Sequence, residues 1–194
     1  MKTVIIDYNA GNVQSVYYAL QRIGVDAEIT ENPDKIKAAG KVIFPGVGEA
    51  GSTMRYLQEH KLDTLIQELT QPVLGICLGM QLLCNYSEEG NTTCLNIFPN
   101  TVKRFKGEEK VPHVGWNSIS NLKGDLFKGV PENSYVYFVH SYYVEVLDDT
   151  IATCNYMQNF SAAIQKDNFY AVQFHPEKSG ETGSQILKNF ILIR

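Results

Sequence analysis

The sequence predicts an α/β fold: a mainly parallel central sheet with helices on both faces, and a smaller antiparallel sheet region in the second half. In the first half, short β-branched runs alternate with segments of helical periodicity. This alternation is typical of βαβ units with right-handed crossovers, which build parallel sheets. Beyond Asn91 the pattern changes to short aromatic and β-branched runs separated by turn residues, which is typical of strands.

The first half is expected to contain three helices and four strands. Apolar residues at helical spacing from Val13 to Ile23 predict the first helix, and Gly24 suits its carboxyl end. Asn32 followed by Pro33 predicts the start of the second, because asparagine caps helices and proline is tolerated at the first helical position. That helix should end near Gly40, and Ser52 to Leu69 should be mostly helical. The expected strands are Thr3 to Asp7, Val25 to Thr30, Lys41 to Phe44 and, opened by Pro72, Val73 to Ile76, with a tight loop at Pro45 to Gly48.

The second half is expected to be mostly strand, closed by an amphipathic helix from Thr182 to Ile193. Turn residues at Lys123 to Asp125 and at Val130 to Asn133 separate the runs. The expected strands are Thr101 to Phe105, Trp116 to Ile119, Tyr135 to Val146, Ile151 to Tyr156, Ser161 to Gln165 and Phe169 to Phe174.

Length and composition limit the classes of function. A chain of 194 residues suits one domain spanning residues 1–194 with a sizeable core. Hydrophobic residues make up 44% and charged residues 20%, the balance of an ordinary globular protein. The net charge is −4, from 17 basic and 21 acidic residues, and no long run of like charge occurs. Binding to nucleic acid or to an anionic membrane surface is therefore disfavoured.

The expected location is the cytoplasm. The apolar run that opens the chain is too short for a signal peptide, because Asp7 interrupts it. Leu69 to Ser87 carries no charge but is broken by polar residues, proline and glycine, so it is interpreted as buried core. The cysteines include no CxxC pair and are expected to be reduced thiols; they are Cys77, Cys84, Cys94 and Cys154.

The run Gly75-Ile76-Cys77-Leu78-Gly79 has the form of a nucleophile elbow between a strand and a helix. Such a turn forces its central residue into a strained backbone conformation and lifts that side chain above the sheet. The thiol of Cys77 is then placed for attack, and the following amide, that of Leu78, points at developing oxyanion charge. The alternative is a buried structural cysteine in a glycine-rich turn.

A base for this thiol is offered by Gln173-Phe174-His175-Pro176-Glu177. Proline at 176 holds His175 extended, and residues two apart on an extended segment point the same way, so Glu177 can orient the imidazole. Together with Cys77 this gives the nucleophile, base and orienting acid of covalent acyl transfer. The other histidines, His60, His113 and His140, are interpreted as solvated or structural.

The glycines from Gly46 to Gly51 match a G-x-G-x-x-G pattern, which raises a dinucleotide site as an alternative. The acid that this fingerprint requires at the end of the next strand is missing, because that strand ends at Cys77. The alternative use of Gly46 to Gly48 is a backbone amide opposite the thiol, which completes an oxyanion hole. No P-loop or zinc-ligand spacing occurs, so neither a metal nor a cofactor is expected.

In their order and separations, these motifs resemble the class I glutamine amidotransferases, and more narrowly the glutaminase subunits of imidazole glycerol phosphate synthases. The resemblance covers essentially the whole chain and implies a flavodoxin-like fold. The segments that carry the narrower match are Asp7 to Asn12, Pro45 to Gly48, Gly75 to Gln81, Pro112 to Asn117, Phe138 to Tyr142 and Gln173 to Ser179. One departure is Asn9, where the family more usually has glycine; asparagine tolerates left-handed backbone.

The resemblance implies hydrolysis of glutamine to glutamate and ammonia, with Cys77, His175 and Glu177 as the catalytic triad. It also implies an oxyanion hole formed by the amides of Val47 and Leu78. The ammonia would pass to a separate (β/α)8-barrel cyclase subunit of a heterodimer that acts in histidine biosynthesis. The implied glutamine-binding residues are Gly46, Gly48, Gln81, Glu89, Ser141 and Tyr142, and the residues facing the barrel would be Asn12, Trp116 and Lys178.

Three alternatives remain open at this point. The first is a paralogous amidotransferase that supplies ammonia to another synthase, such as one of surface-sugar synthesis. The second is a cysteine hydrolase of the same fold, for example a peptidase, which would need no partner. The third is a regulatory subunit without catalysis, against which the intact Cys77, His175 and Glu177 argue.

Overall fold

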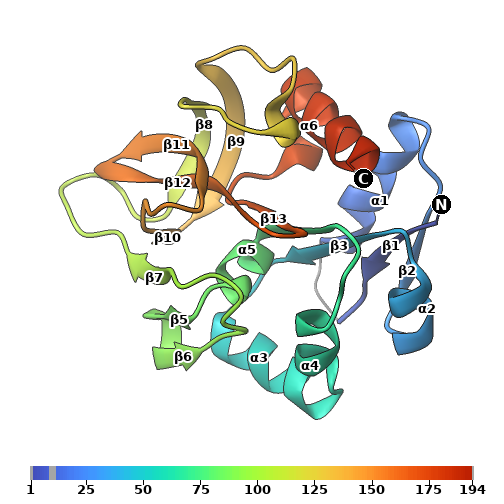
Figure 1. Cartoon of the computed structure of the whole chain (residues 1–194). Coiled ribbons are helices and arrows are strands. Elements are labelled where there is room, and N and C mark those ends of the chain that lie inside the picture. Colours follow the sequence, from blue (N-terminus) through green and yellow to red (C-terminus); the bar gives the residue numbers. More distant parts are fainter. Residues whose placement is uncertain (1, 9–11, 194) are drawn as a thin grey trace.

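The computed structural model describes residues 2–8 and 12–193. Its main element is a seven-stranded sheet with the strand order β11-β12-β13-β4-β3-β1-β2 (Figure 1). The strands from β13 to β2 pair in parallel, whereas β12 and β11 continue the same sheet in antiparallel pairing. The bounds are β1 Thr3–Ile6, β2 Ala27–Thr30, β3 Lys41–Gly46, β4 Val73–Cys77, β11 Thr150–Tyr156, β12 Gln158–Lys166 and β13 Phe169–Val172.

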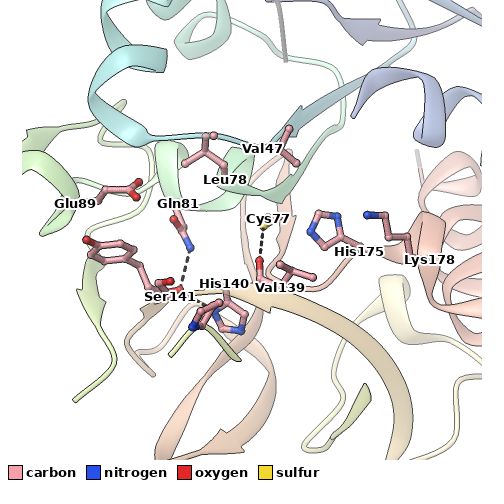
Figure 2. A pocket seen from close by; sticks show the side chains of 13 residues that line it. Val47, Cys77, Leu78, Gln81, Glu89, Val139, His140, Ser141, His175 and Lys178 are labelled. Carbon is pink, nitrogen blue, oxygen red and sulfur yellow. Dashed lines mark hydrogen bonds between the residues drawn. The ribbon is translucent and has the colours of Figure 1, made fainter. Parts of the chain in front are cut away.

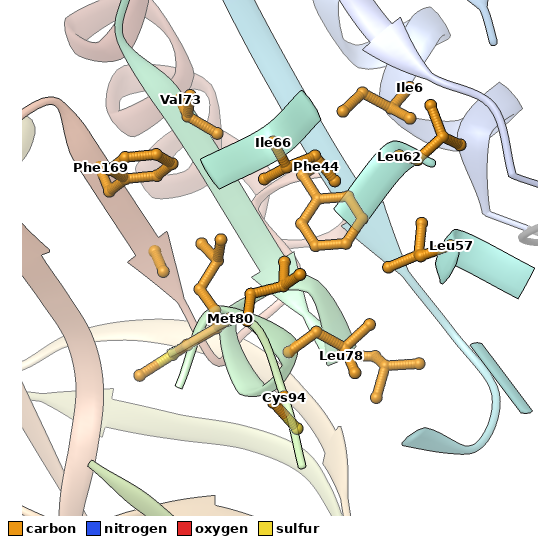
Figure 3. Packing of buried hydrophobic residues seen from close by; sticks show 14 of the residues in the cluster. Ile6, Phe44, Leu57, Leu62, Ile66, Val73, Leu78, Met80, Cys94 and Phe169 are labelled. Atoms are coloured by element: carbon orange, nitrogen blue, oxygen red, sulfur yellow. The ribbon is translucent and has the colours of Figure 1, made fainter. Parts of the chain in front are cut away.

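Helices cover both faces of this sheet. On one face, α2, α3, α4 and α5 pack against side chains such as Phe44 and Val73 (Figure 3). On the other face, α1 and α6 pack against alternate side chains of the same strands, such as Ile43 and Leu74. The strands are apolar throughout because both of their faces are buried. The helices are α1 Val13–Arg22, α2 Pro33–Ala38, α3 Ala50–Glu59, α4 Leu62–Gln67, α5 Leu78–Leu83 and α6 Gly180–Leu192.

Two smaller sheets lie beside the main one. One has the order β10-β7-β5-β6 and the other is the two-stranded antiparallel ribbon β8-β9. The α/β class with a mainly parallel sheet is confirmed, but three of the later strands extend the main sheet, and the β5–β7 pair is parallel. The bounds are β5 Tyr86–Ser87, β6 Thr92–Thr93, β7 Thr101–Arg104, β8 His113–Ile119, β9 Ser134–His140 and β10 Tyr142–Val144, with short 3-10 helices η1 Glu89–Asn91, η2 Asp125–Phe127 and η3 Pro176–Lys178.

Some expected boundaries differ from the structure. The segment from Ser52 to Leu69 is mostly helical, as expected, but it is divided into α3 and α4, because Lys61 adopts left-handed backbone with φ of 56°. The strand expected from Trp116 begins at His113. The run from Tyr135 to Val146 divides at Ser141 into β9 and β10, which belong to different sheets. The expected loop at Pro45 to Gly48 is partly strand: β3 continues through Pro45 to Gly46, since both residues still pair with β4.

No helix within residues 2–8 and 12–193 is long and apolar enough to cross a lipid bilayer.

The carboxyl ends of β3 and β4 are held close together by α5. Gly46 at the end of β3 pairs with Cys77 at the end of β4. Gly79, in the first turn of α5, lies so close to β3 that a Cβ atom there would be 2.0 Å from the carbonyl oxygen of Phe44. Backbone atoms cannot yield as a flexible side chain can, so only glycine fits at this crossing.

We therefore expect Gly79→Ala to destabilise the protein by about 3 kcal/mol or more, because α5 must move away from β3. Urea unfolding followed by circular dichroism measures this loss. Gly24→Ala is the matched control: Gly24 has φ of 80°, but a Cβ atom added there would have no other atom within 4 Å. It should lose only about 1 kcal/mol from the left-handed backbone. Equal stability of the two variants would contradict the close approach.

Candidate active site

The predicted turn between strand and helix is present at Cys77. This residue ends β4 and directly precedes α5, with φ of 54° and ψ of −107°. A positive φ is uncommon for a residue with a side chain and costs about 1 kcal/mol or more. Cys77 is 7% exposed and its thiol points into a cavity, where Sγ lies 3.8 Å from the carbonyl oxygen of Val139.

His175 lies beside this thiol after the end of β13, and Glu177 contacts the imidazole from behind. Nδ1 of His175 is 2.8 Å from Oε1 of Glu177, and their side chains are 3% and 0% exposed. His175 has extended backbone, as Pro176 predicts. A second donor reaches the same carboxylate oxygen, because Nδ2 of Asn12 is 2.6 Å away. The carboxylate of Glu177 is therefore held from two sides, by the imidazole and by the residue that precedes α1.

The charges of this pair stabilise each other. Burial would lower the pKa of His175, but its interactions with Cys77 and Glu177 outweigh burial and raise that pKa above 6.5. Burial would likewise raise the pKa of Glu177, but His175 and the hydrogen bond from Asn12 hold it below its usual value. Both shifts favour an imidazolium paired with a carboxylate.

Gln173 is a neighbour of the thiol that was not predicted as a site residue. Its Nε2 lies 3.7 Å from Sγ of Cys77, and its Oε1 accepts a hydrogen bond of 3.0 Å from Gln81. Alternation along an extended segment could have indicated it, because Gln173 precedes His175 by two residues and therefore shares its side.

These side chains open onto a cavity of about 330 Å³ (Figure 2). Within it, Cys77 lies between Gln81 and Glu89 on one side and His175 and Lys178 on the other. The lining residues are Val47, Gly48, Cys77, Leu78, Gln81, Glu89, Pro112, Val139, His140, Ser141, Tyr142, His175 and Lys178. The structure thus brings together every residue named for the triad, the oxyanion hole or the substrate except Glu177 and Gly46, which lie behind the lining.

Gly46 supports the wall from behind instead of facing the cavity. A Cβ atom there would be 2.7 Å from both the backbone nitrogen of Gly79 and the hydroxyl oxygen of Tyr8. The Tyr8 hydroxyl donates a hydrogen bond to the neighbouring carbonyl oxygen of Pro45. Gly46 therefore lets β3, α5 and Tyr8 meet directly beneath the loop that carries Val47.

The wall opposite His175 carries an acid and an amide side chain, each held by a hydrogen bond. Glu89 accepts a 2.8 Å hydrogen bond from the backbone amide of Ala50, at the start of α3. Burial raises the pKa of Glu89, and the hydrogen bond opposes that rise. Gln81 donates a 3.0 Å hydrogen bond to the carbonyl oxygen of Tyr142. A ligand with a cationic end would therefore find a carboxylate on this side of the thiol.

The three residues expected at a partner interface have different surroundings. Trp116 is 55% exposed on the β8-β9 ribbon, where it meets the ring of Tyr137 edge to face. Lys178 is exposed at the rim of the cavity. Asn12 is instead buried against Glu177. The departure at Asn9 falls outside the described residues.

Within the ranges 2–8 and 12–193, no group of three or more His, Cys, Asp or Glu side chains has the geometry to hold a metal ion. The chemistry that the arrangement offers is attack by a thiol on a carbonyl carbon. The imidazole of His175 lies beside that thiol to move protons, and Glu177 fixes its orientation.

Comparison with known proteins gives a family and close relatives. The family model "Glutamine amidotransferase class-I" matches residues 4–193. A protein of Bacteroides fragilis (strain YCH46) named "Imidazole glycerol phosphate synthase subunit HisH" is 63% identical over 98% of this chain and 99% of its own. A protein of the same name from Bacteroides thetaiotaomicron is 58% identical over 98% of this chain and 99% of its own.

Among solved structures, a crystal structure described as a glutamine amidotransferase superposes with a TM-score of 0.76. The match covers 97% of both chains at 16% sequence identity. At that identity the likeness concerns the fold alone.

Removal of the Glu177 charge should lower the pKa of His175. In Glu177→Gln we expect a fall of about 1 pH unit or more, because the anion that favours the imidazolium is gone. Titration of the imidazole signals by NMR measures it, with the exposed ring of His60 as an internal control. An unchanged His175 titration would contradict the pairing.

The same shift predicts how stability depends on pH. Because the folded pKa of His175 lies above 6.5, its contribution to stability is complete below pH 6.5 and is lost as pH rises through the folded value. In Glu177→Gln that loss should occur at lower pH than in the wild type. Urea midpoints measured across the alkaline range would show the displacement.

Proposed function

The chain belongs to the class-I glutamine amidotransferase family, and from this premise we propose that it hydrolyses glutamine as the HisH subunit of an imidazole glycerol phosphate synthase. The observation that carries the proposal is the grouping of Cys77, His175 and Glu177 at one cavity. The product ammonia is then used in histidine biosynthesis. Glutamine is converted to glutamate and ammonia, and no cofactor is needed.

In the first half of the reaction, His175 takes the proton of the Cys77 thiol, and Sγ attacks the side-chain amide carbon of glutamine. The carbonyl oxygen becomes an oxyanion that accepts hydrogen bonds from the backbone amides of Val47 and Leu78, whose residues line the cavity around the thiol. His175 donates a proton to the amide nitrogen, the C–N bond breaks and ammonia leaves. The product on the enzyme is a cysteinyl thioester.

In the second half, His175 takes a proton from water, and the resulting hydroxide attacks the thioester carbon. The C–S bond breaks, His175 returns its proton to Sγ to regenerate the Cys77 thiol, and glutamate leaves. Glu177 keeps the imidazole in one orientation through both steps, and Asn12 holds Glu177. Asn12 therefore serves the triad as a positioning residue as well as lying toward the proposed partner.

The substrate is held by groups that surround the thiol. Glu89 is suited to the α-amino group of glutamine because it is an acid at the opposite end of the cavity from His175. Gly48, Gln81 and the segment Ser141-Tyr142 complete the contacts. Gly46 acts from behind the wall, where it allows β3 and α5 to meet.

The partner is a cyclase subunit with a (β/α)8-barrel fold, with which this chain forms a heterodimer. Support comes from the word "subunit" in the relatives' name and from the exposed apolar face of the β8-β9 ribbon beside the cavity. Trp116 and Lys178 lie on that side. A synthase of another pathway is the alternative partner.

We treat residues 1–194 as one amidotransferase domain, a view supported by the family match from residue 4 to 193. We assign the enzyme to the cytoplasm. The four cysteines are free thiols, as expected in a reducing compartment, and the relatives' name is that of a biosynthetic enzyme.

Cys77→Ser should lower glutamate release by about a thousandfold or more, because a serine hydroxyl is a far weaker nucleophile in this arrangement. Glu177→Gln should lose less, since it removes only the orienting charge. An enzyme-coupled glutamate assay measures both, and circular dichroism checks folding. Cys94→Ser, a buried thiol outside the cavity, is the matched control and should retain activity. A fully active Cys77→Ser would refute the assigned nucleophile.

The cyclase subunit of the same genome, with its ribonucleotide ligand, should raise glutamate release by at least about tenfold, which corresponds to about 1.4 kcal/mol of coupling. The resemblance implies this gating, in which rotation of the Val47 amide toward the oxyanion completes the oxyanion hole. Glutamate assays with and without the cyclase measure the effect. Glutamine hydrolysis without stimulation or complex formation would favour a paralogue with another partner, and hydrolysis of small esters or peptides alone would favour a peptidase.

A further inference from the structure

Two buried histidines face each other at the cavity wall, where His140 lines the cavity and His113 lies behind it. His113 on β8 and His140 on β9 are directly opposite in the antiparallel ribbon. Nδ1 of His113 lies 3.1 Å from Nε2 of His140, and the side chain of Asn117 lies 3.4 Å from Nε2 of His113. At the other end, Nδ1 of His140 lies 2.7 Å from the carbonyl oxygen of Tyr142.

The partners of the two rings determine where each proton lies. A carbonyl oxygen only accepts, so Nδ1 of His140 carries a proton that it donates to Tyr142. In a neutral ring Nε2 of His140 is then an acceptor, and it accepts a hydrogen bond from the Nδ1–H of His113. Nε2 of His113 in turn accepts a hydrogen bond from Nδ2 of Asn117. The orientation of that amide is fixed because its Oδ1 accepts a hydrogen bond from the backbone N–H of Ser118. All the hydrogen bonds therefore run in one direction, from Asn117 to Tyr142.

The packing around His113 and His140 fixes the orientation of the rings and favours their neutral form. The ring of His113 is stacked against Tyr156 at 4.0 Å and against Phe138 at 5.0 Å. Burial lowers the pKa of His113 to about 4 and that of His140 to about 3. At neutral pH both rings are therefore uncharged, which is the state that the one-directional chain requires.

The receiving carbonyl is part of the cavity wall. Tyr142 follows Ser141, and both residues line the cavity. The carbonyl oxygen of Tyr142 accepts a second hydrogen bond from Gln81, which also contacts Gln173 beside the Cys77 thiol. Two donors on one oxygen fix the plane of the peptide that follows Tyr142 and limit the rotation of the segment.

We propose that His140, held in a single tautomer by His113, is a positioning residue that fixes the Ser141-Tyr142 segment for glutamine binding. This inference rests on the proposed function, because that function makes the segment a substrate contact. It gives the two histidines a role that their burial alone does not require: they connect the β8-β9 ribbon to the substrate pocket through oriented hydrogen bonds. Neither ring exchanges protons with the substrate.

The test compares two substitutions of His140 with the wild type. His140→Phe keeps an aromatic ring but cannot donate to the Tyr142 carbonyl oxygen, whereas His140→Asn keeps an amide donor near the position of Nδ1. In His140→Phe the KM for glutamine should rise between about threefold and tenfold, as expected for one lost hydrogen bond, while kcat changes less than KM. In His140→Asn the KM should return most of the way to the wild-type value.

His60→Phe is the matched control, since it makes the same exchange on an exposed helix end far from the cavity lining. It should leave KM unchanged. A His140→Phe variant that loses thermal stability but keeps the wild-type KM would show a purely structural role and overturn the inference. Equal KM values for the Phe and Asn variants would also overturn it.

A second measurement needs no activity and no variant. Nitrogen-15 NMR of the imidazole rings should show both His113 and His140 protonated on Nδ1 and unprotonated on Nε2 between pH 6 and pH 8. A proton on Nε2 of either ring, or a cationic ring in that pH range, would contradict the proposed direction of the hydrogen bonds. If the wild type releases no glutamate even with its cyclase, the proposed function fails, and with it the role of His140 in glutamine binding. If the wild type is active and His140→Phe has the wild-type KM for glutamine, only the inference about His140 fails.

Discussion

The close approach of α5 to the ends of β3 and β4 is the constraint on which the active site depends. Gly79 allows the helix to touch the backbone of β3, and the turn that leads into the helix holds Cys77 at positive φ. The same crossing places Gly46 against Gly79. The thiol, the loop that carries Val47 and the amide of Leu78 thus share one rigid base. The strain at Cys77 is tolerated because the two parallel strands and their buried faces fix this geometry.

Much of this arrangement could be predicted from local sequence. The alternation of β-branched runs with helical periodicity indicates the parallel sheet, and Gly75 to Gly79 indicates the turn at Cys77. Proline at 176 indicates that His175 is extended with Glu177 beside it. Each of these features is determined within a few residues of chain. The break at Lys61 had no such signal, because lysine is an ordinary helix former and neither glycine nor proline marks the position.

The contacts that escaped prediction depend on register between distant segments. Asn12 meets Glu177 only because α1 packs beside η3, the turn that carries Glu177. His113 meets His140 only because β8 and β9 pair with one particular register, and a shift of one residue would turn both rings to the opposite face. Gln173 lies between these two cases, since its side of the strand follows from alternation but its contact with Gln81 does not. Polar networks of this kind become visible only when the strands are placed in space.

The β8-β9 ribbon separates two tasks by the pleat of its strands. Val114, Trp116 and Tyr135 point outward, while His113 and Asn117 lie on the opposite face, in the hydrogen-bonded group that includes His140. Substitutions at odd and even positions of the same strand therefore affect different faces of the ribbon. A lineage could exchange its ammonia-consuming partner through outward positions alone while the inward positions keep the glutamine pocket intact. Such modularity gives a physical reason why amidotransferases with different partners can remain alike in their catalytic half.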